Sequence, residues 1–248
     1  MKTSKPDFII IGAMKCATSA IYEYLCQHPK VWNRKPKEVH FYTQNYDKGL
    51  DWYLNLFQDK PDECIAGEAS PSYFDNSYST EIPQLILEDF PEIKIIVSLR
   101  NPTDRAVSHF YHIQSKLGEL SEYDVASYFS SEHINAFQEN KVADLPPYFG
   151  GILKIGQYAK RLPYWLKTYP SDQMILINQA KLDQFEYQTM KEIFEFLNLE
   201  PLAKENNYQK VYANNYPETP KEVRDNLDKF YQSDNQALQG LLGEAFAW

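Results

Sequence analysis

The stretch DFIIIGAMKCATSAIYEYL, residues 7–25, decides the fold that this sequence predicts. Its first part, at 7–11, is a short β-branched run that stops at a glycine, which is typical of a buried strand. Residues 18–27 carry apolar side chains at helical spacing, and Thr18 or Ser19 is a good N-cap for that helix. The stretch therefore predicts a strand, a tight loop and a helix in immediate succession.

The same alternation continues along the rest of the chain. Apolar runs at 93–99 and 173–178 predict two further buried strands, and residues 64–67 predict a shorter one. Apolar residues at helical spacing also predict helices at 49–57, 81–90, from Thr103 onward, at 156–169, at 189–197 and in part of 220–248. By contrast, VHFY at 39–42 has a β-like composition. Because strands alternate with helices, we expect an α/β fold, a single domain over residues 1–248 with a central, mostly parallel sheet flanked by helices.

The composition is that of an acidic globular protein. The chain has 248 residues, of which 43% are hydrophobic, and a chain of this length buries roughly 70–75% of its unfolded surface. With 25 basic and 34 acidic residues the net charge is −9, which argues against binding to nucleic-acid polymers or anionic membranes. The three cysteines are scattered, and no run approaches the length of about 20 apolar residues that a membrane span needs. We therefore expect a cytoplasmic location without membrane insertion.

The loop GAMKCATSA, at 12–20, has the features of an anion-binding site. Backbone N–H groups at a helix start favour a phosphate, Lys15 adds a mobile positive charge, and Thr18 and Ser19 add hydroxyl donors. A Walker A loop requires G-x-x-x-x-G-K-[ST], whereas here Ala17 precedes Thr18 and the lysine lies three positions before it. Nucleoside-triphosphate hydrolysis is therefore disfavoured. An ordinary strand-to-helix turn with a solvated lysine is the alternative.

A second anion-binding element is predicted in IKIIVSLRNPTDRAVSH, at 93–109. Arg100 follows a predicted strand, and ligands of open α/β sheets bind at the edge where the strands end. Ser108 lies on the following predicted helix. An arginine fork with a hydroxyl suits a phosphate monoester. The alternative is that Arg100 pairs with Asp104 or another nearby acid.

Both segments, in this order, resemble the sulfotransferase superfamily that uses 3′-phosphoadenosine 5′-phosphosulfate (PAPS), and within it the heparan-sulfate sulfotransferases and their bacterial relatives. Residues 12–25 resemble the 5′-phosphosulfate loop of the family, and SLRNPTDRAVSHF resembles its 3′-phosphate motif. PKEVHFYTQNYDKGLDWYLNLF resembles the K-E-x-x-F-F segment of the family and the G-x-x-W-Y helix that follows it. GEASPSYF resembles the family loop E-K-[ST]-P-x-Y. GQYAKRLPYWLKTYPSDQMILIN resembles the G-x-Y helix and the late strand, and FAW resembles the C-terminal end of the family. The resemblance spans nearly the whole chain.

The resemblance implies a donor site for PAPS. Lys15 would contact the bridging oxygen and the sulfonate, and would neutralise charge on the leaving phosphate. Backbone N–H groups at 15–20 would hold the 5′-phosphate, while Arg100 and Ser108 would hold the 3′-phosphate. The implied donor-binding residues are Gly12, Lys15, Cys16, Ala17, Thr18, Ser19, Ala20, Arg100 and Ser108.

The resemblance also implies the catalytic residues Glu38, Lys15 and His40. Glu38 matches the glutamate that acts as general base on the acceptor hydroxyl, and His40 matches a position that lines the acceptor site. Sulfuryl transfer depends on positioning, charge stabilisation and removal of a proton, so a nearby carboxylate is useful and no metal is required. The alternatives are a surface carboxylate paired with Lys35 or Lys37, and a packed histidine.

Three departures from the family pattern stand out. Ala17 occupies a position where glycine is usual, and Ala69 replaces the lysine of E-K-[ST]-P-x-Y. The segment QKVYANNYPETP, at 209–220, lacks the basic loop that closes on the donor in the animal heparan-sulfate enzymes. Asn214 is a candidate for the residue that takes over this role.

The sequence thus predicts sulfuryl transfer from PAPS to an acceptor hydroxyl, with adenosine 3′,5′-bisphosphate (PAP) as the second product. The acceptor is expected to be a saccharide, a small natural product or a carrier-tethered chain. A local basic cluster beside Glu38 would suit an anionic acceptor or would form a solvated loop; its members are Lys30, Arg34, Lys35 and Lys37. A kinase-like phosphate-binding protein and a catalytically inactive relative that binds the nucleotide are the alternatives. The sequence gives no indication of the oligomeric state.

Overall fold

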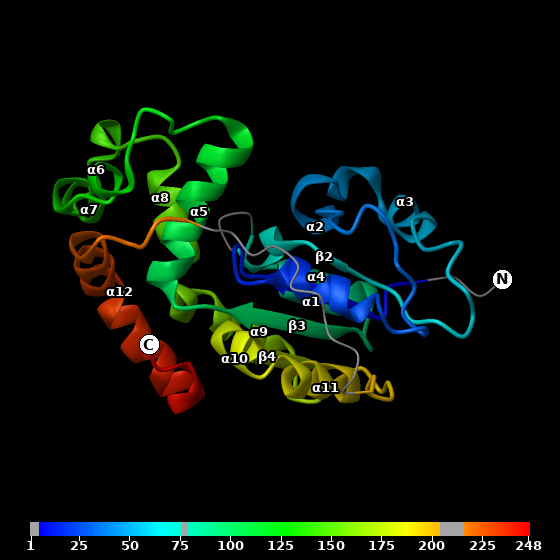
Figure 1. Ribbon diagram of the computed structural model, residues 1–248. Coiled ribbons are helices and arrows are strands. Elements are labelled where there is room, and N and C mark those ends of the chain that lie inside the picture. Colours follow the sequence, from blue (N-terminus) through cyan, green and yellow to red (C-terminus); the bar gives the residue numbers. More distant parts are fainter. Residues whose placement is uncertain (1–4, 76–78, 204–215) are drawn as a thin grey trace. The chain divides into compact units, whose positions relative to one another are not determined.

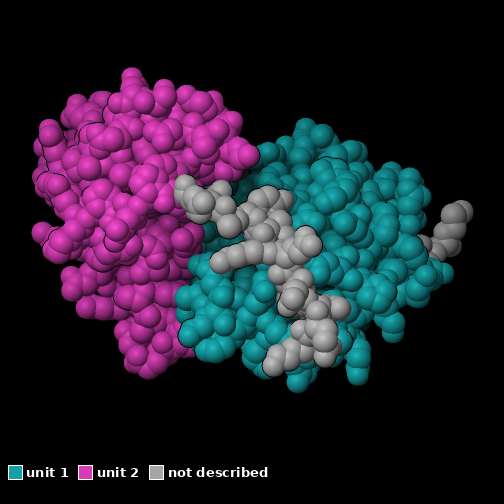
Figure 2. Space-filling view, viewed as in Figure 1, with its two compact units in different colours: residues 1–99, 161–213 teal, residues 100–160, 214–248 magenta. Residues whose placement is uncertain are grey.

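A computed structural model describes residues 5–75, 79–203 and 216–248. The chain divides into two compact units, residues 1–99 with 161–213 and residues 100–160 with 214–248, which Figure 2 colours separately. Each unit is described by itself below. Asn214 lies outside the described residues, as does most of the segment at 209–220.

The first unit is built on a parallel four-stranded sheet in the order β2-β1-β3-β4 (Figure 1). The strands are β1 (Phe8–Gly12), β2 (Gly67–Ala69), β3 (Lys94–Leu99) and β4 (Met174–Asn178). Ile9 of β1 pairs with Glu68 on one side and with Ile95 on the other. Every residue of β1 is buried, so both faces of this strand are covered, as is usual for parallel sheets. The predicted α/β class with a parallel sheet is confirmed, whereas one domain over residues 1–248 stays a prediction.

The described residues of the first unit also form helices. They are α1 (Thr18–Leu25), α2 (Phe41–Gln44), α3 (Leu50–Asn55), α4 (Ile82–Asp89), α9 (Leu162–Thr168), α10 (Gln179–Gln184) and α11 (Glu186–Phe196). Ile10 and Ile96 of the sheet share one buried cluster with Ile21 of α1 and Ile193 of α11. This packing fixes the start of α1 against the carboxyl ends of the strands.

Two sequence predictions of secondary structure are wrong. The β-like segment at 39–42 is a turn that leads into α2, because His40 has a φ of 52° and Phe41 starts the helix. The helix predicted at 156–169 is instead a short 3₁₀ turn at Tyr158–Lys160 followed by α9, which begins only at Leu162. Pro163 lies in the first turn of α9, where the missing N–H costs no hydrogen bond.

The second unit is helical. Its helices are α5 (Pro102–Leu117), α6 (Val125–Tyr128), α7 (Ser131–Gln138), α8 (Phe149–Ile155) and α12 (Lys221–Leu242). Asn101 caps α5, since its side chain accepts hydrogen bonds from the backbone N–H groups of Thr103 and Asp104. The core of the unit includes Phe110, Tyr128 and Tyr231. In the part of the chain that the structure describes, no helix is both long and apolar enough to cross a membrane.

Candidate active site

The predicted phosphate loop connects β1 to α1 as the sequence indicates. The N-cap of α1 is Ala17, in a left-handed conformation with a φ of 62°, so the prediction of Thr18 or Ser19 as N-cap is wrong. An alanine in this conformation costs about 1–2 kcal/mol, which explains why glycine is usual at this position. Because alanine has no side-chain acceptor, Ala17 leaves the first N–H groups of α1 uncapped. The helix start therefore has the chemistry of an anion site.

Gly12 is the position in this loop that requires glycine. Its φ is +146°, and an added Cβ would lie 2.6 Å from Cβ of Phe74 and 3.1 Å from the carbonyl oxygen of Pro71. The loop can therefore approach the segment after β2 this closely only without a side chain at position 12.

Replacing Gly12 by alanine is expected to lower the free energy of unfolding by about 2–4 kcal/mol, from overpacking together with backbone strain. The measurement is urea denaturation followed by circular dichroism. Gly240→Ala in α12 is the matched control, because an added Cβ meets nothing within 4 Å there. Equal stability of the two variants would contradict the assignment of a tight loop.

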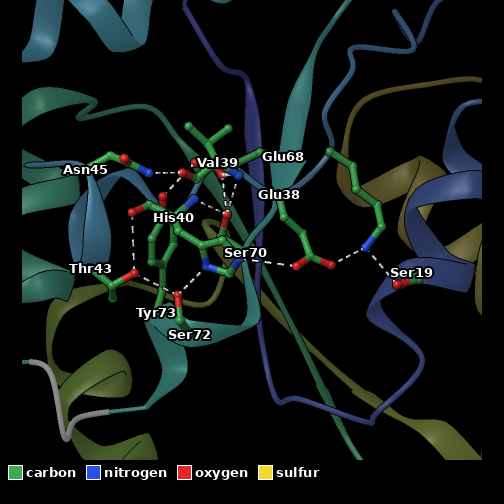
Figure 3. Close-up of polar contacts among 11 residues, drawn as sticks. Ser19, Glu38, Val39, His40, Thr43, Asn45, Glu68, Ser70, Ser72 and Tyr73 are labelled. Atoms are coloured by element: carbon green, nitrogen blue, oxygen red, sulfur yellow. Dashed lines mark hydrogen bonds and ion pairs between the residues drawn. The ribbon is translucent and has the colours of Figure 1, made fainter. Parts of the chain in front are cut away.

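The Glu38 carboxylate contacts the side chains of two residues close in the chain, Lys37 and His40 (Figure 3). Its Oε1 accepts a hydrogen bond from Nζ of Lys37, and its Oε2 lies 3.2 Å from Nε2 of His40. The Glu38 side chain is 40% exposed. The hydrogen bond to His40, followed by the hydrogen bond and charge of Lys37, lowers the pKa of Glu38 to about 2 although partial burial opposes the shift. Glu38 is thus a carboxylate at neutral pH.

Lys37 links Glu38 to the phosphate loop. Its Nζ donates to Oγ of Ser19 at 2.8 Å as well as to Glu38. The pairing with Lys37 that was the sequence alternative for Glu38 is therefore present, whereas Lys35 pairs with Glu23 at 3.1 Å. The Glu38 carboxylate is thus part-exposed, ionised and linked through Lys37 to the first turn of α1.

His40 is held on both sides of its ring. Since a carboxylate only accepts, Nε2 carries the proton that bonds Glu38, and Nδ1 lies 2.7 Å from Oγ of Ser72. Ser72 is in turn 2.8 Å from Oγ1 of Thr43. Sequence reasoning missed Ser72 and Thr43 as partners of His40. The match of GEASPSYF to a family loop indicated that this segment belongs to the site, but not which side chains meet.

Lys37→Met tests the electrostatics of Glu38. Removing the ammonium group is expected to raise the pKa of Glu38 from about 2 toward the ordinary value of 4.5. A protonated base accepts no proton, so activity falls as the pH drops through this pKa, and the acid limb of kcat/KM moves to higher pH. The ¹³C shift of the Glu38 carboxyl group measures the pKa directly. Lys35→Met, which removes the partner of Glu23, should leave it unchanged.

Arg100 and Ser108 lie in the second unit. The carbonyl oxygen of Arg100 accepts a hydrogen bond from the Tyr158 hydroxyl at 3.0 Å, and Oγ of Ser108 lies 2.7 Å from the hydroxyl of Tyr216. Asp104, the partner weighed for Arg100, accepts instead from Nη2 of Arg224 at 2.9 Å. The joint role of Arg100 and Ser108 in holding a 3′-phosphate stays a prediction.

The basic cluster of the first unit is largely paired. Arg34 is 2% exposed, donates to the carbonyl oxygen of Pro36, and lies 4.9 Å from the ring centroid of Phe57. Lys35 and Lys37 have the carboxylate partners described above. Three of the four cations therefore have partners within the unit. Among the described residues there is no group of three or more His, Cys, Asp or Glu side chains that could hold a metal ion.

The family model described as "Sulfotransferase domain" matches residues 5–236, and the chain belongs to this family. Human heparan sulfate glucosamine 3-O-sulfotransferase 3B1 is 28% identical over 266 residues, which cover 98% of this chain and 65% of that protein. The chain thus spans just under two thirds of the length of this curated relative. The predicted sulfotransferase is confirmed at the level of the family.

Solved structures share the fold. A sulfotransferase from Alicyclobacillus acidocaldarius superposes with a TM-score of 0.75 at 24% identity, and the match covers 96% of each chain. Mouse sulfotransferase SULT7A1, solved in complex with PAP, gives a TM-score of 0.60 at 14% identity over 97% of this chain and 87% of its own. At these identities the similarity establishes the fold.

Proposed function

We propose that this chain transfers a sulfuryl group from PAPS to a hydroxyl group of a saccharide and releases PAP. The observation that carries the proposal is the ionised Glu38 carboxylate, which Lys37 connects to Ser19 at the start of α1. The sulfotransferase family match and the PAP complex of the mouse structural neighbour support the donor. The name of the human relative supports a saccharide acceptor over a small natural product or a carrier-tethered chain.

In the proposed reaction, the acceptor oxygen attacks sulfur in line with the bridging oxygen of the donor. The new bond joins the acceptor oxygen to sulfur, and the bond between sulfur and the bridging oxygen breaks. Glu38 takes the hydroxyl proton, while Lys15 neutralises the charge that develops on the leaving phosphate. His40 orients Glu38 through the hydrogen bond from Nε2. No step requires a metal ion.

The donor would be held by the residues that the family resemblance implies. The loop residues Gly12, Cys16, Ala17 and Ala20 supply backbone around the 5′-phosphate, and Thr18 and Ser19 supply hydroxyls. The uncapped start of α1 fits a phosphate group, because its N–H groups and dipole favour an anion. Arg100 and Ser108 would bind the 3′-phosphate. We further propose that residues 1–248 form a single domain. We also propose a cytoplasmic location, which the three free cysteines support because disulfides are rare in reducing compartments.

Transfer of ³⁵S from labelled PAPS to a panel of acceptors tests the proposed function. The panel contains N-sulfated heparan fragments, unsulfated heparosan fragments and hydroxylated acyl-pantetheines. Label in a saccharide supports the proposal. Label found only in the acyl-pantetheines would keep the reaction and replace the acceptor class, and PAP binding without transfer to any acceptor would favour an inactive relative.

Arg100→Ala tests the predicted 3′-phosphate site. Loss of a charge-assisted pair is expected to weaken PAP binding by about 10- to 100-fold, measured by isothermal titration calorimetry. The affinity for 5′-AMP, which has no 3′-phosphate, should stay the same. A parallel loss for both nucleotides would show that Arg100 acts elsewhere in the nucleotide site.

A further inference from the structure

A fully buried carboxyl group belongs to β2 beside the proposed catalytic residues. Glu68 is 0% exposed, and its Oε1 accepts hydrogen bonds from the hydroxyls of Tyr53 at 2.5 Å and Tyr73 at 3.0 Å. Burial raises the pKa of Glu68, and the surrounding donors oppose this shift. A carboxyl group taken out of water costs free energy unless it is hydrogen-bonded, so this network has to be satisfied for the unit to fold.

The second oxygen of Glu68 faces the turn that carries Glu38 and His40 (Figure 3). Oε2 accepts from the Ser70 hydroxyl and, at 3.2 Å, from the backbone N–H of Val39. Oγ of Ser70 accepts in turn from the backbone N–H of Val39 at 3.0 Å and of His40 at 2.9 Å. The two amides that follow Glu38 are thus bonded to Glu68 and Ser70, which we call the Glu68–Ser70 pair.

The turn needs such support because of its backbone conformation. His40 has a φ of 52°, and a non-glycine residue keeps a left-handed conformation at a cost of about 1–3 kcal/mol only when its surroundings enforce it. This conformation lets the imidazole reach both Glu38 and Ser72. The hydrogen bonds to the Glu68–Ser70 pair constrain this turn, together with the bond from Nδ2 of Asn45 to the carbonyl oxygen of Val39 at 2.8 Å.

We propose that the Glu68–Ser70 pair positions the catalytic groups of the transfer reaction. By binding the amides of Val39 and His40, the pair fixes the turn at 38–40 and so aims the Glu38 carboxylate at the acceptor. The inference rests on the proposed role of Glu38 as general base. A displacement of about 1 Å in such a group lowers a rate by about 100-fold, so even a small relaxation of the turn would be visible in kcat.

The chain offers a matched control for a purely structural role. The Tyr53 hydroxyl bonds the same carboxyl group, but at Oε1, away from the turn. Tyr53→Phe therefore weakens the buried network without removing the link to Val39 and His40. A structural role predicts that all variants of the network behave alike, whereas a positioning role separates the two oxygens.

The experiment compares Ser70→Ala, Glu68→Gln and Tyr53→Phe in kcat, in KM for PAPS and in PAP affinity. Ser70→Ala is expected to lower kcat by about 10- to 100-fold and Glu68→Gln by about tenfold, with KM for PAPS and PAP affinity retained. Tyr53→Phe should keep kcat, and Ser70→Thr should restore it because the hydroxyl is kept. In ¹⁵N spectra of the histidine rings, the His40 signals should move in Ser70→Ala and stay in place in Tyr53→Phe.

Wild-type kcat and unchanged His40 signals in both Ser70→Ala and Glu68→Gln would overturn the inference, as would an equal loss of kcat in Tyr53→Phe. The proposed base is tested separately by Glu38→Gln. If Glu38→Gln is inactive while Ser70→Ala is fully active, only the positioning inference fails. If Glu38→Gln is active, the proposed function of Glu38 fails whatever the other variants do, and the His40 spectra alone decide whether the pair holds the turn.

Discussion

Replacing Glu38 by glutamine is expected to lower kcat by about 10²- to 10⁴-fold while PAP affinity stays the same. The carboxamide has the size of the carboxylate but cannot take the proton of the acceptor hydroxyl. The hydrogen bonds from His40 and Lys37 lower the pKa of Glu38 to about 2, so its side chain is a carboxylate over the whole neutral range. The measurement is steady-state transfer of label from PAPS, together with calorimetric titration of PAP.

Glu23→Gln is the matched control for this variant. Glu23 is a carboxylate of α1 that pairs with Lys35, and its replacement should leave both kcat and PAP affinity unchanged. Full activity of Glu38→Gln would show that another group removes the proton. A loss of PAP affinity in this variant would assign Glu38 to donor binding instead.

Lys15→Ala is expected to lower kcat by about 10²- to 10³-fold, the usual effect of losing one group that stabilises charge in the transition state. Lys15 lies in the loop between β1 and α1 with a φ of 68°, near the helix start that would hold the 5′-phosphate. Because its proposed partner is the leaving phosphate, KM for PAPS should change less than kcat. Single-turnover transfer from labelled PAPS measures the chemical step.

Lys167→Ala serves as the control, because Lys167 is an exposed lysine in the last turn of α9, in the same unit but outside the loop and the basic cluster. It should keep wild-type kcat. If Lys15→Ala raised KM for PAPS and left kcat intact, the lysine would stabilise bound PAPS and the transition state to the same extent. It would then contribute affinity but no acceleration.

Local patterns in the sequence were sufficient for β1, β3, β4 and the loop between β1 and α1, whereas the strand predicted at 64–67 begins only at Gly67. The β-branched runs at 7–11 and 93–99 became β1 and β3, because buried parallel strands read as continuous apolar runs. The N-cap was wrong for a local reason. Capping rules favour a side-chain acceptor, whereas α1 starts after Ala17 in a left-handed conformation, and no side chain caps its first N–H groups.

The geometry around Glu38 could not be predicted from local patterns. The backbone N–H of His40, in its left-handed turn, donates to Ser70, thirty positions away in the chain, and Ser70 in turn donates to the buried carboxyl group of Glu68. Likewise, Arg34 counted as part of a cationic cluster, yet it is 2% exposed and lies over an aromatic ring. Such contacts arise only when the strands bring distant segments together, and the family resemblance indicated the segments without their pairing.

Calorimetric titration of the unmodified protein with PAP, with 5′-AMP and with Mg²⁺–ATP tests the central claim most directly. A site for the PAPS donor predicts one PAP bound per chain, binding of 5′-AMP weaker by about 10-fold or more because the 3′-phosphate contacts are lost, and no preference for Mg²⁺–ATP. Binding of Mg²⁺–ATP in preference to PAP, or no binding of PAP at all, would contradict the assignment of this chain as a PAPS-dependent sulfotransferase.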